Sequence, residues 1–269
     1  MSTRASDALP VYFVDAFADR PYAGNPAAIC PLDRWLPEPA MQAIAAEIGF
    51  SETAFIVREG EDWRIRWFTP TLEVDLVGHA TLAAAFLILE RIDPRRAEIR
   101  FDSRGGPLIV GRAGDLLSMD FPARVAAPVV APPRLVEGLG KPPVAVLAAT
   151  HYLAVYADAA DVRGLAPDMA TLAALDRAAV IVTAPGTPEL GADFVSRFFA
   201  PANGVPEDPV SGVAHCTLIP YWASRLGKTR LIGRQLSKRG GELVCEDRGA
   251  RVLIAGRAAL VLEGRIVRP

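Results

Sequence analysis

The sequence predicts a sheet-rich α+β fold built from two similar halves. Short runs rich in Val, Ile and Phe recur along the whole chain, whereas helical patterns are few. Three short motifs also occur twice, in the same order, in the first and the second half of the chain. A repeat of this kind indicates two copies of one supersecondary arrangement, and it therefore predicts the architecture before any single element does.

The elements follow from local composition and from glycine and proline positions. The strand-like segments are Val11–Phe17, Thr53–Val57, Arg64–Phe68, Pro107–Val110, Tyr152–Tyr156, Ala179–Thr183, Phe194–Phe199, Arg251–Ile254 and Ala259–Leu262. Helices are predicted over Pro39–Ile48, which Gly49 closes, over Pro167–Leu175, and after Gly78 and Gly212.

The repeat also predicts the domain organisation. It pairs Arg66–Pro70 with Arg197–Pro201, His79–Leu82 with His215–Leu218, and Arg104–Leu108 with Arg239–Leu243. The second copy is a few residues longer, which we assign to an insertion around Glu207–Pro209. We therefore expect an N-terminal half-domain over residues 1–122, a C-terminal half-domain over 134–269, and a linker rich in Pro, Ala and Val over 123–133.

Each half is expected to wrap a sheet around one central helix. Ala80–Leu89 is apolar on nearly all sides, which in a soluble protein predicts a helix buried all round. In the second copy Pro220 lies in the middle of the corresponding helix. Because proline removes a backbone donor, we expect it to bend or shorten that helix.

Composition excludes several classes of function. The chain has 269 residues, 51% of them hydrophobic, and a net charge of −2 without a basic face, so nucleic acid is not an expected partner. The longest apolar run is Leu82–Leu89, too short to span a bilayer, and the start of the chain lacks the pattern of a secretory signal. We therefore expect a cytoplasmic protein without a membrane segment. The cysteines Cys30, Cys216 and Cys245 are too far apart to suggest a disulfide framework or a metal site.

The chemistry is expected at the starts of the two central helices. A helix start presents free backbone N–H groups and the positive end of the helix dipole, which together bind a carboxylate. Such groups also stabilise the enolate-like charge that forms when a proton leaves carbon. The substrate is thus expected to be a small carboxylic acid. The preceding loops hold the acids Glu73, Asp75, Glu207 and Asp208.

Four stretches carry a resemblance to a known family. Gly24–Pro26, Phe50–Phe55, Asp75–Thr81 and Glu207–Cys216 resemble the PhzF (phenazine biosynthesis-like, PhzC/PhzF) family of isomerases and epimerases. The likeness extends from about residue 11 to 264. It implies the diaminopimelate-epimerase type of fold, two pseudo-symmetric halves with an active site between them, a homodimer, and catalysis without a cofactor.

The resemblance also implies roles for individual residues. Glu52 would be the catalytic acid/base, with His79 and Asp208 lining the substrate pocket. The other predicted substrate-binding residues lie in the matched stretches: Asn25, Ser51, Gly78, Gly212 and Val213. The local sequence agrees for Glu52, because it stands between the Gly49 helix stop and an apolar strand, at a rigid strand edge. The corresponding strand of the second half, Ala178–Thr183, offers no acid, so one catalytic base is expected.

Alternatives remain open at this point. Proton transfer within one molecule and epimerisation of an amino acid or cyclic acid share their first step, and a binding module on the same fold would need no catalysis. No cysteine lies at either helix start, which disfavours a thiol-pair racemase. Many relatives have Ser where this chain has Val213, and this leaves the substrate open. His215 lies deeper in its helix than His79 and is as well explained as a core or capped histidine.

Overall fold

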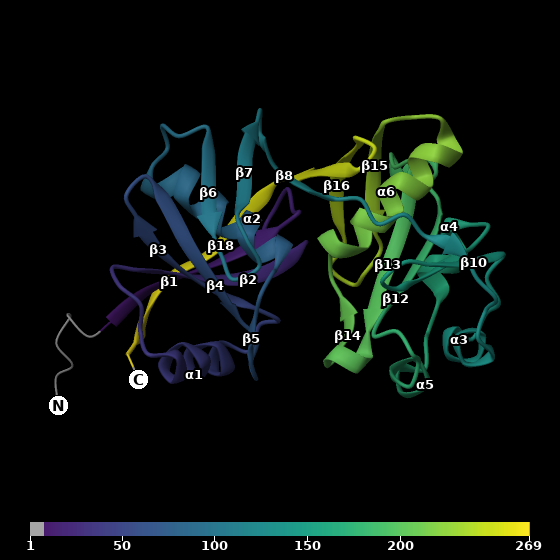
Figure 1. Cartoon of the computed structure of the whole chain (residues 1–269), viewed down its shortest axis with the longest axis horizontal. Helices are drawn as coiled ribbons and strands as arrows, with labels where there is room; N and C mark the ends of the chain where they lie inside the picture. The colour runs from purple at the N-terminus through teal and green to yellow at the C-terminus, as the bar shows by residue number, and fades with distance from the viewer. Residues whose placement is uncertain (1–7, 269) are drawn as a thin grey trace. The chain divides into compact units, whose positions relative to one another are not determined.

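The computed structural model describes residues 8–268 and divides into two compact units. The first contains residues 8–119 and 256–268, and the second contains residues 120–255. Strands dominate both units and few helices occur, as predicted for this α+β chain (Figure 1). Within the described residues, no helix is long and apolar enough to cross a membrane.

The first unit is a mixed sheet around one helix. Its strands are β1 (Ala8–Ala16), β2 (Asn25–Leu32), β3 (Thr53–Glu59), β4 (Asp62–Phe68), β5 (Glu73–Val74), β6 (Glu98–Asp102), β7 (Leu108–Ala113), β8 (Leu116–Pro122) and β18 (Ala258–Val267). Its helices are α1 (Glu38–Ile48), α2 (Gly78–Leu87) and the π-helical turn η2 (Ile88–Ile92). The strand order is β18-β1-β2-β3-β4-β6-β7-β8, with β5 paired to β4, and the β2–β3 and β4–β6 pairs are parallel.

The second unit repeats this topology. Its strands are β9 (Ala127–Pro128), β10 (Ala145–Ala148), β11 (Tyr152–Val155), β12 (Val180–Pro185), β13 (Phe194–Ala200), β14 (Val205–Asp208), β15 (Arg230–Gln235), β16 (Gly241–Asp247) and β17 (Arg251–Gly256). Its helices are α3 (Pro133–Leu139), α4 (Ala159–Gly164), α5 (Met169–Ala173), α6 (Gly212–Leu226) and the 3₁₀ turns η3 (Pro188–Leu190) and η4 (Pro201–Asn203). The order is β9-β10-β11-β12-β13-β15-β16-β17, with β14 paired to β13 and the β11–β12 and β13–β15 pairs parallel.

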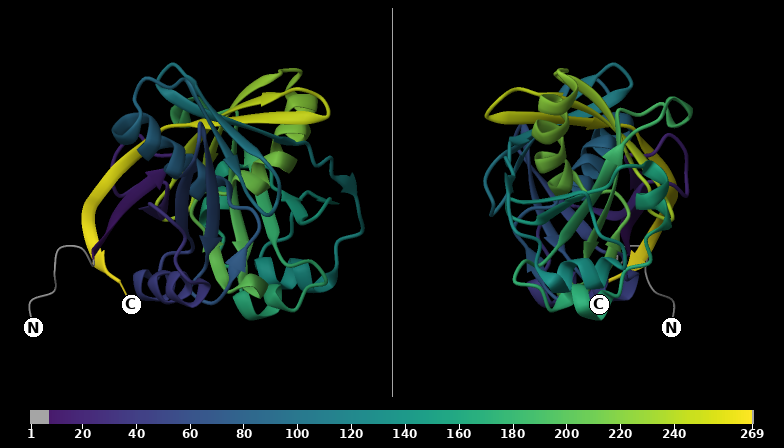
Figure 2. Two further views of the ribbon diagram at one scale, coloured as in Figure 1. Left: turned by 60° about the vertical axis from the view of Figure 1, so that its left-hand side comes forward. Right: turned by 90° about the vertical axis from the view of Figure 1, so that its right-hand side faces the viewer.

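The end of the chain departs from the expected half-domain boundaries. Residues 134–269 were expected to form one half, but β18 pairs with β1 in the first unit, as Figure 2 shows for the yellow and purple strands. By strand order, β18 takes in the first unit the place that β9 takes in the second. The outermost strand of the first repeat is therefore supplied by the C-terminal segment, and part of the expected linker, residues 123–133, is strand β9.

Helix α2 is the central helix of the first unit. Eight of its ten residues are buried, and it packs against β1, β2, β3 and β18. An apolar helix surrounded by strands loses nearly all of its surface to the core, which explains why Ala80–Leu89 lacks a polar face.

Pro220 was expected to bend or shorten the second central helix, and helix α6 corrects the expectation of a shorter helix. It continues through Pro220 and has fifteen residues, against ten in α2. Proline cannot donate to the carbonyl of Cys216, four residues earlier. That carbonyl instead accepts from the backbone N–H of Arg124 at 2.9 Å. The proline is tolerated because the neighbouring segment supplies the missing donor.

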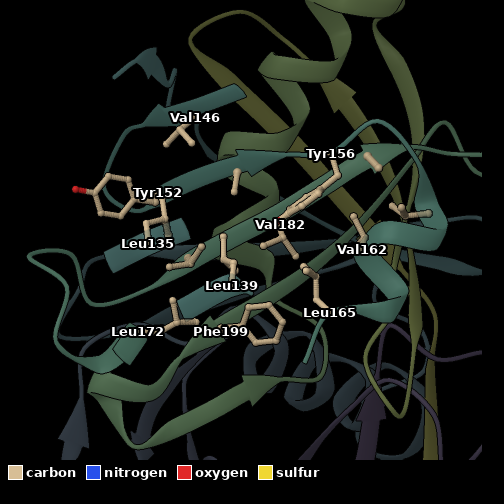
Figure 3. Close-up of a cluster of buried hydrophobic side chains, with 14 of the residues drawn as sticks. Leu135, Leu139, Val146, Tyr152, Tyr156, Val162, Leu165, Leu172, Val182 and Phe199 are labelled. Carbon is tan, nitrogen blue, oxygen red and sulfur yellow. The ribbon is translucent and has the colours of Figure 1, made fainter. Parts of the chain in front are cut away.

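The core of the second unit lies between its sheet and its three short helices. Leu135 and Leu139 of α3 and Val162 of α4 pack with Tyr156 and Phe199 in one buried cluster (Figure 3). Helix α3 begins at the end of the expected linker and was not predicted. Its burial of two leucines against the sheet explains why this segment is ordered structure.

Gly24 holds the connection between β1 and β2. Its φ is +64°, and a Cβ built there would lie 2.1 Å from the carbonyl oxygen of Ala16. Both the left-handed backbone and the close approach require glycine. This turn leads directly into Asn25, the first residue of β2 and fully buried.

We predict that Gly24→Ala lowers the free energy of unfolding by at least about 2 kcal/mol more than Gly114→Ala does. Gly114 has a φ of +68° and nothing within 4 Å of a built Cβ, so its substitution costs only the left-handed backbone, about 1–2 kcal/mol. The excess at Gly24 measures the clash with Ala16. Urea denaturation of both variants compares them, and equal losses would contradict the close approach.

Candidate active site

Glu52 lies between the end of α1 and the start of β3. Gly49 ends α1 in the left-handed conformation with φ 71°, and Thr53 begins β3. The carbonyl of Glu52 accepts from the backbone N–H of Ala28 in β2 at 3.4 Å. The backbone of Glu52 is therefore fixed at the edge of the parallel β2–β3 pair, as its sequence position suggested. Ser51, the preceding residue, is half-buried.

The Glu52 carboxylate contacts His79, the second residue of α2. Oε2 of Glu52 lies 3.3 Å from Nε2 of His79, and the two side chains are 18% and 8% exposed. Burial lowers the pKa of His79, and the nearby Glu52 carboxylate opposes this shift without reversing it. His79 is therefore neutral near pH 7, beside an acid that reaches solvent only in part. The structure thus brings together two of the residues that the sequence singled out.

The start of α2 presents backbone N–H groups without a side-chain cap. Its N-cap residue is Val77, which has no side-chain oxygen to accept from the first turn. The hydroxyl of Thr81 donates to the Val77 carbonyl at 2.6 Å, so it satisfies an acceptor and leaves the first donors available. Gly78, the first helical residue, adds no side chain there. An anionic group is favoured at this position by the N–H groups and the helix dipole.

The second helix start is built differently. Ser211 is the N-cap of α6, and its hydroxyl accepts from the N–H of Ala214 at 3.3 Å. Gln235 holds the preceding loop, because its amide donates to the Asp208 carbonyl at 2.6 Å and accepts from the Ser211 N–H at 2.9 Å. Gly212 and Val213 follow as the first two helical residues and are half-buried. The predicted residues Asp208, Gly212 and Val213 therefore form one local group in the second unit.

A shared hydrogen bond identifies the counterpart of Glu52 in the second unit. The carbonyl of Glu52 accepts from Ala28, and the carbonyl of Ala179 accepts from Tyr152 at 3.3 Å in the equivalent parallel pair β11–β12. Ala179 therefore occupies the position of Glu52. The second unit has a methyl group where the first has a carboxylate.

The helix starts correct the alignment of the two histidines. The sequence paired His79 with His215, but His79 is the second residue of α2 and His215 the fourth of α6. Nδ1 of His215 lies 2.7 Å from the carbonyl oxygen of Ser211, and the hydroxyl of Thr81 lies 2.6 Å from that of Val77. The structural counterpart of His215 is thus Thr81.

By the same count, the counterpart of His79 is Val213, the second residue of α6. His215 is completely buried, and burial lowers its pKa from the usual 6.5 to about 4. His215 is therefore a neutral core histidine, the structural alternative that the sequence left open.

Two of the acids before the helices form bridges to arginines that the sequence did not predict. Glu73 binds Arg66, whose hydrogen bonds lower the pKa of Glu73, and Glu207 binds Arg197. The repeated motifs contained both arginines, and both loops contained an acid. This coincidence was the signal that could have identified the two pairs.

The three cysteines are buried and free. Burial raises the pKa of Cys30 to about 12 and that of Cys216 to about 11, and it also raises the pKa of Cys245. A thiol with a raised pKa is a poor proton acceptor near neutral pH. Within residues 8–268, no group of His, Cys, Asp and Glu side chains is arranged to hold a metal ion.

We predict that His215 makes stability depend on pH. Because its folded pKa lies below its unfolded value, the unfolded chain binds the proton more tightly, and stability falls as pH drops from about 6.5 toward 4. In His215→Thr, threonine can make the bond that Thr81 makes, without a titrating ring. From pH 7 to pH 5 the wild type should lose about 2 kcal/mol more unfolding free energy than the variant. Urea unfolding at both pH values measures this, and parallel pH profiles would refute it.

Comparison with known proteins identifies the family. Residues 14–264 match the PhzC-PhzF family, described as phenazine biosynthesis-like protein. A Pseudomonas aeruginosa protein named as an uncharacterized isomerase is 54% identical over 259 residues, which cover 96% of this chain and 98% of that protein. The crystal structure of a PhzF family protein from Enterococcus faecalis matches with a TM-score of 0.93 and 43% identity, covering 96% of this chain and 99% of the other.

More distant structures bear on the fold alone. A hydroxyproline epimerase from Agrobacterium vitis matches with a TM-score of 0.60 at 10% identity, over 98% of this chain and 94% of the other. Together with the PhzF structures, this likeness confirms the predicted epimerase-type α+β fold. The chain belongs to the PhzC-PhzF, phenazine biosynthesis-like family and is an enzyme of the isomerase class.

Proposed function

We propose that the protein isomerises a small carboxylic acid, with Glu52 as the single acid/base that moves the proton. The observation that carries this proposal is the 3.3 Å contact of the Glu52 carboxylate with neutral His79 at the uncapped start of α2. General acid–base catalysis requires an ionisable group held within reach of a substrate hydrogen, next to groups that stabilise the developing charge. Glu52 and the start of α2 supply these two parts in one unit.

The start of α2 is the proposed site for the substrate carboxylate. The N–H groups of Gly78 and His79 can donate to it, and no charged side chain is needed at that point. Removal of a proton from the neighbouring carbon places charge on the carboxylate or its conjugated system. The same N–H groups and the helix dipole stabilise that charge more strongly in the transition state than in the ground state.

The proposed reaction moves one proton from one carbon to another and returns Glu52 to its starting state. Glu52 enters as the carboxylate, takes a proton from carbon, and becomes the carboxylic acid while the C–H electron pair moves into the conjugated system. Glu52 then returns the proton to another carbon of the same molecule and is a carboxylate again. No electron acceptor takes part, so the proposed reaction needs no cofactor.

The two units differ at the positions of the catalytic residues, and this difference supports a mechanism with one catalytic base and not two. Ala179 stands at the position of Glu52 and Val213 at that of His79, so the second unit offers neither group. The buried thiols, with raised pKa values, do not offer a cysteine pair either. Epimerisation through Glu52 at an amino acid or cyclic acid is the nearest alternative, and a non-catalytic binding module is the alternative from another class.

Several further assignments belong to this proposal. We assign substrate contacts to Asn25, Ser51, Asp208, Gly212 and Val213. A homodimer and a cytoplasmic location remain predictions; sedimentation velocity tests the first and cell fractionation the second. Val213 has no side-chain donor, so we expect an apolar substrate group beside it.

We predict that Glu52→Gln loses about 10²–10⁴-fold in turnover, the contribution typical of a general acid/base. Glutamine keeps the size of the side chain but cannot accept the proton. The assay incubates protein with a panel of amino and unsaturated carboxylic acids in D₂O and follows deuterium entering C–H positions by NMR.

Glu59→Gln, at the exposed end of the same strand β3, is the matched control and should keep the wild-type rate. Deuterium incorporation by Glu52→Gln at the wild-type rate would exclude Glu52 as the acid/base. A wild-type protein that binds members of the panel but deuterates none would favour the binding module.

We predict that Cys216→Ser and Cys30→Ser keep deuterium exchange within about threefold of the wild type, because thiols with raised pKa values hold their protons near pH 7. The exchange assay is the same, with circular dichroism to verify folding. A thousandfold loss in a folded variant would instead indicate a thiol-based racemase.

A further inference from the structure

Each unit carries a two-point ion pair directly before its central helix. Nε and Nη2 of Arg66 donate to the two carboxylate oxygens of Glu73, both at 2.7 Å. Arg197 binds Glu207 in the same way, at 2.7 and 3.0 Å. We infer that the two bridges are positioning pairs, which fix the loops leading into α2 and α6 so that the helix-start N–H groups are preset for an anionic ligand. The inference deepens the proposed function and rests on it.

The spacing from bridge to helix is the same in both units. Glu73 lies four positions before Val77, the N-cap of α2, and Glu207 lies four positions before Ser211, the N-cap of α6. The turns that connect each arginine to its glutamate differ in length by three residues. The number of residues between the arginine and the glutamate therefore differs between the units, whereas the number between the glutamate and the helix is the same.

Each arginine also ties the loop to the rest of its unit. Nη2 of Arg66 donates to Glu38, the first residue of α1, at 2.9 Å, and the guanidinium lies 5.2 Å from the Phe68 ring centroid. Nη1 of Arg197 donates to the Leu165 carbonyl after α4 at 2.7 Å. A guanidinium has five donors in a rigid plane, so it can bind the carboxylate at two points and a third group at once. A lysine cannot reproduce this geometry.

A second restraint acts on the loop before α2. Arg104 donates to Glu73 at 2.9 Å and pairs with Asp75 at 3.3 Å. The backbone of Gly105 approaches so closely that an added Cβ would lie 2.6 Å from the Asp75 carbonyl oxygen. The loop is therefore held from both sides.

Stability alone does not explain the two bridges. A partly buried ion pair is a weak source of folding free energy, because desolvation of both charges offsets their attraction. The two units keep this bridge although the second lacks both Glu52 and His79 at the matching positions, where Ala179 and Val213 stand. The bridge is thus associated with presenting a helix start, and not with the acid/base itself.

The test compares Arg66→Lys and Arg197→Lys with Arg234→Lys. Each lysine keeps the charge but loses the planar pair of donors. Arg234 lies in the β15–β16 hairpin, outside the loops that lead into α2 and α6, and both of its donors bind one oxygen of Glu242. This pair is about 40% exposed and serves as the control. Sodium benzoate, a rigid monocarboxylate, is the probe. Its dissociation constant is measured from ¹⁵N–¹H NMR shifts of the Gly78 and His79 amides in one unit and of Gly212 in the other.

We expect benzoate to bind roughly 5- to 20-fold more weakly to the variant of the matching unit, since preset geometry is lost. Amide hydrogen exchange in residues 75–80 for Arg66→Lys, and in 208–214 for Arg197→Lys, should quicken at least about tenfold while global unfolding moves little. Arg234→Lys should resemble the wild type. If Arg66→Lys does not fold, Glu73→Gln, which removes one charge and keeps the shape, replaces it.

Three results would overturn the inference: no benzoate shift at these amides in the wild type, unchanged affinity and exchange in both variants, or an equal loss in Arg234→Lys. Failure of the proposed function is a separate result. It would appear as benzoate binding that depends on the bridges, in a protein that moves no deuterium into any acid.

Discussion

Helix α2 starts inside a core without a side-chain cap, and much of the first unit is organised around that constraint. Its first backbone donors need an acceptor, and Val77 supplies none. Negative charge is favoured at this end, which suits the Glu52 carboxylate and an anionic ligand. The loop before α2 is held by the Arg66–Glu73 bridge, as the loop before α6 is held by the Arg197–Glu207 bridge. In α6, Ser211 caps its own helix.

The two units share topology and differ in chemistry. Both have the same strand order, the same two parallel pairs, and an arginine–glutamate bridge before the central helix. Yet Ala179 and Val213 stand in the second unit where the first has Glu52 and His79. Duplication explains the scaffold, whereas the acid/base function we propose depends on what is not duplicated. This separation is why the fold alone could not identify the mechanism.

Local sequence patterns predicted those parts of the site whose structure is set by residues close by in the sequence. Gly49 closes α1 and Thr53 opens β3, which fixes Glu52, and both central helices begin at the predicted glycines. The pairing of strands that are far apart in the sequence could not be predicted from local patterns. Such a pairing, between β1 and β18, places β18 in the first unit. The sequence alignment of the two histidines was wrong because the same His-x-Thr-Leu motif begins two residues after the N-cap in α2 but four residues after it in α6. Residues of the two helices correspond when they are counted from the N-cap. The repeat contained an arginine and a following acid in each half, which indicated the two bridges, but each loop holds two acids and only the structure shows that Glu73 and Glu207 are the partners.

The central claim is that Glu52 stands at the reacting carbon of a carboxylic acid held by the start of α2. A crystal structure of the Glu52→Gln protein with an acid that the wild type deuterates tests this most directly. The account predicts the substrate carboxylate on the N–H groups of Gly78 and His79. It also predicts the exchanging carbon about 3–3.5 Å from the side chain at position 52. A carbon facing any other ionisable group, with position 52 out of reach, would contradict it.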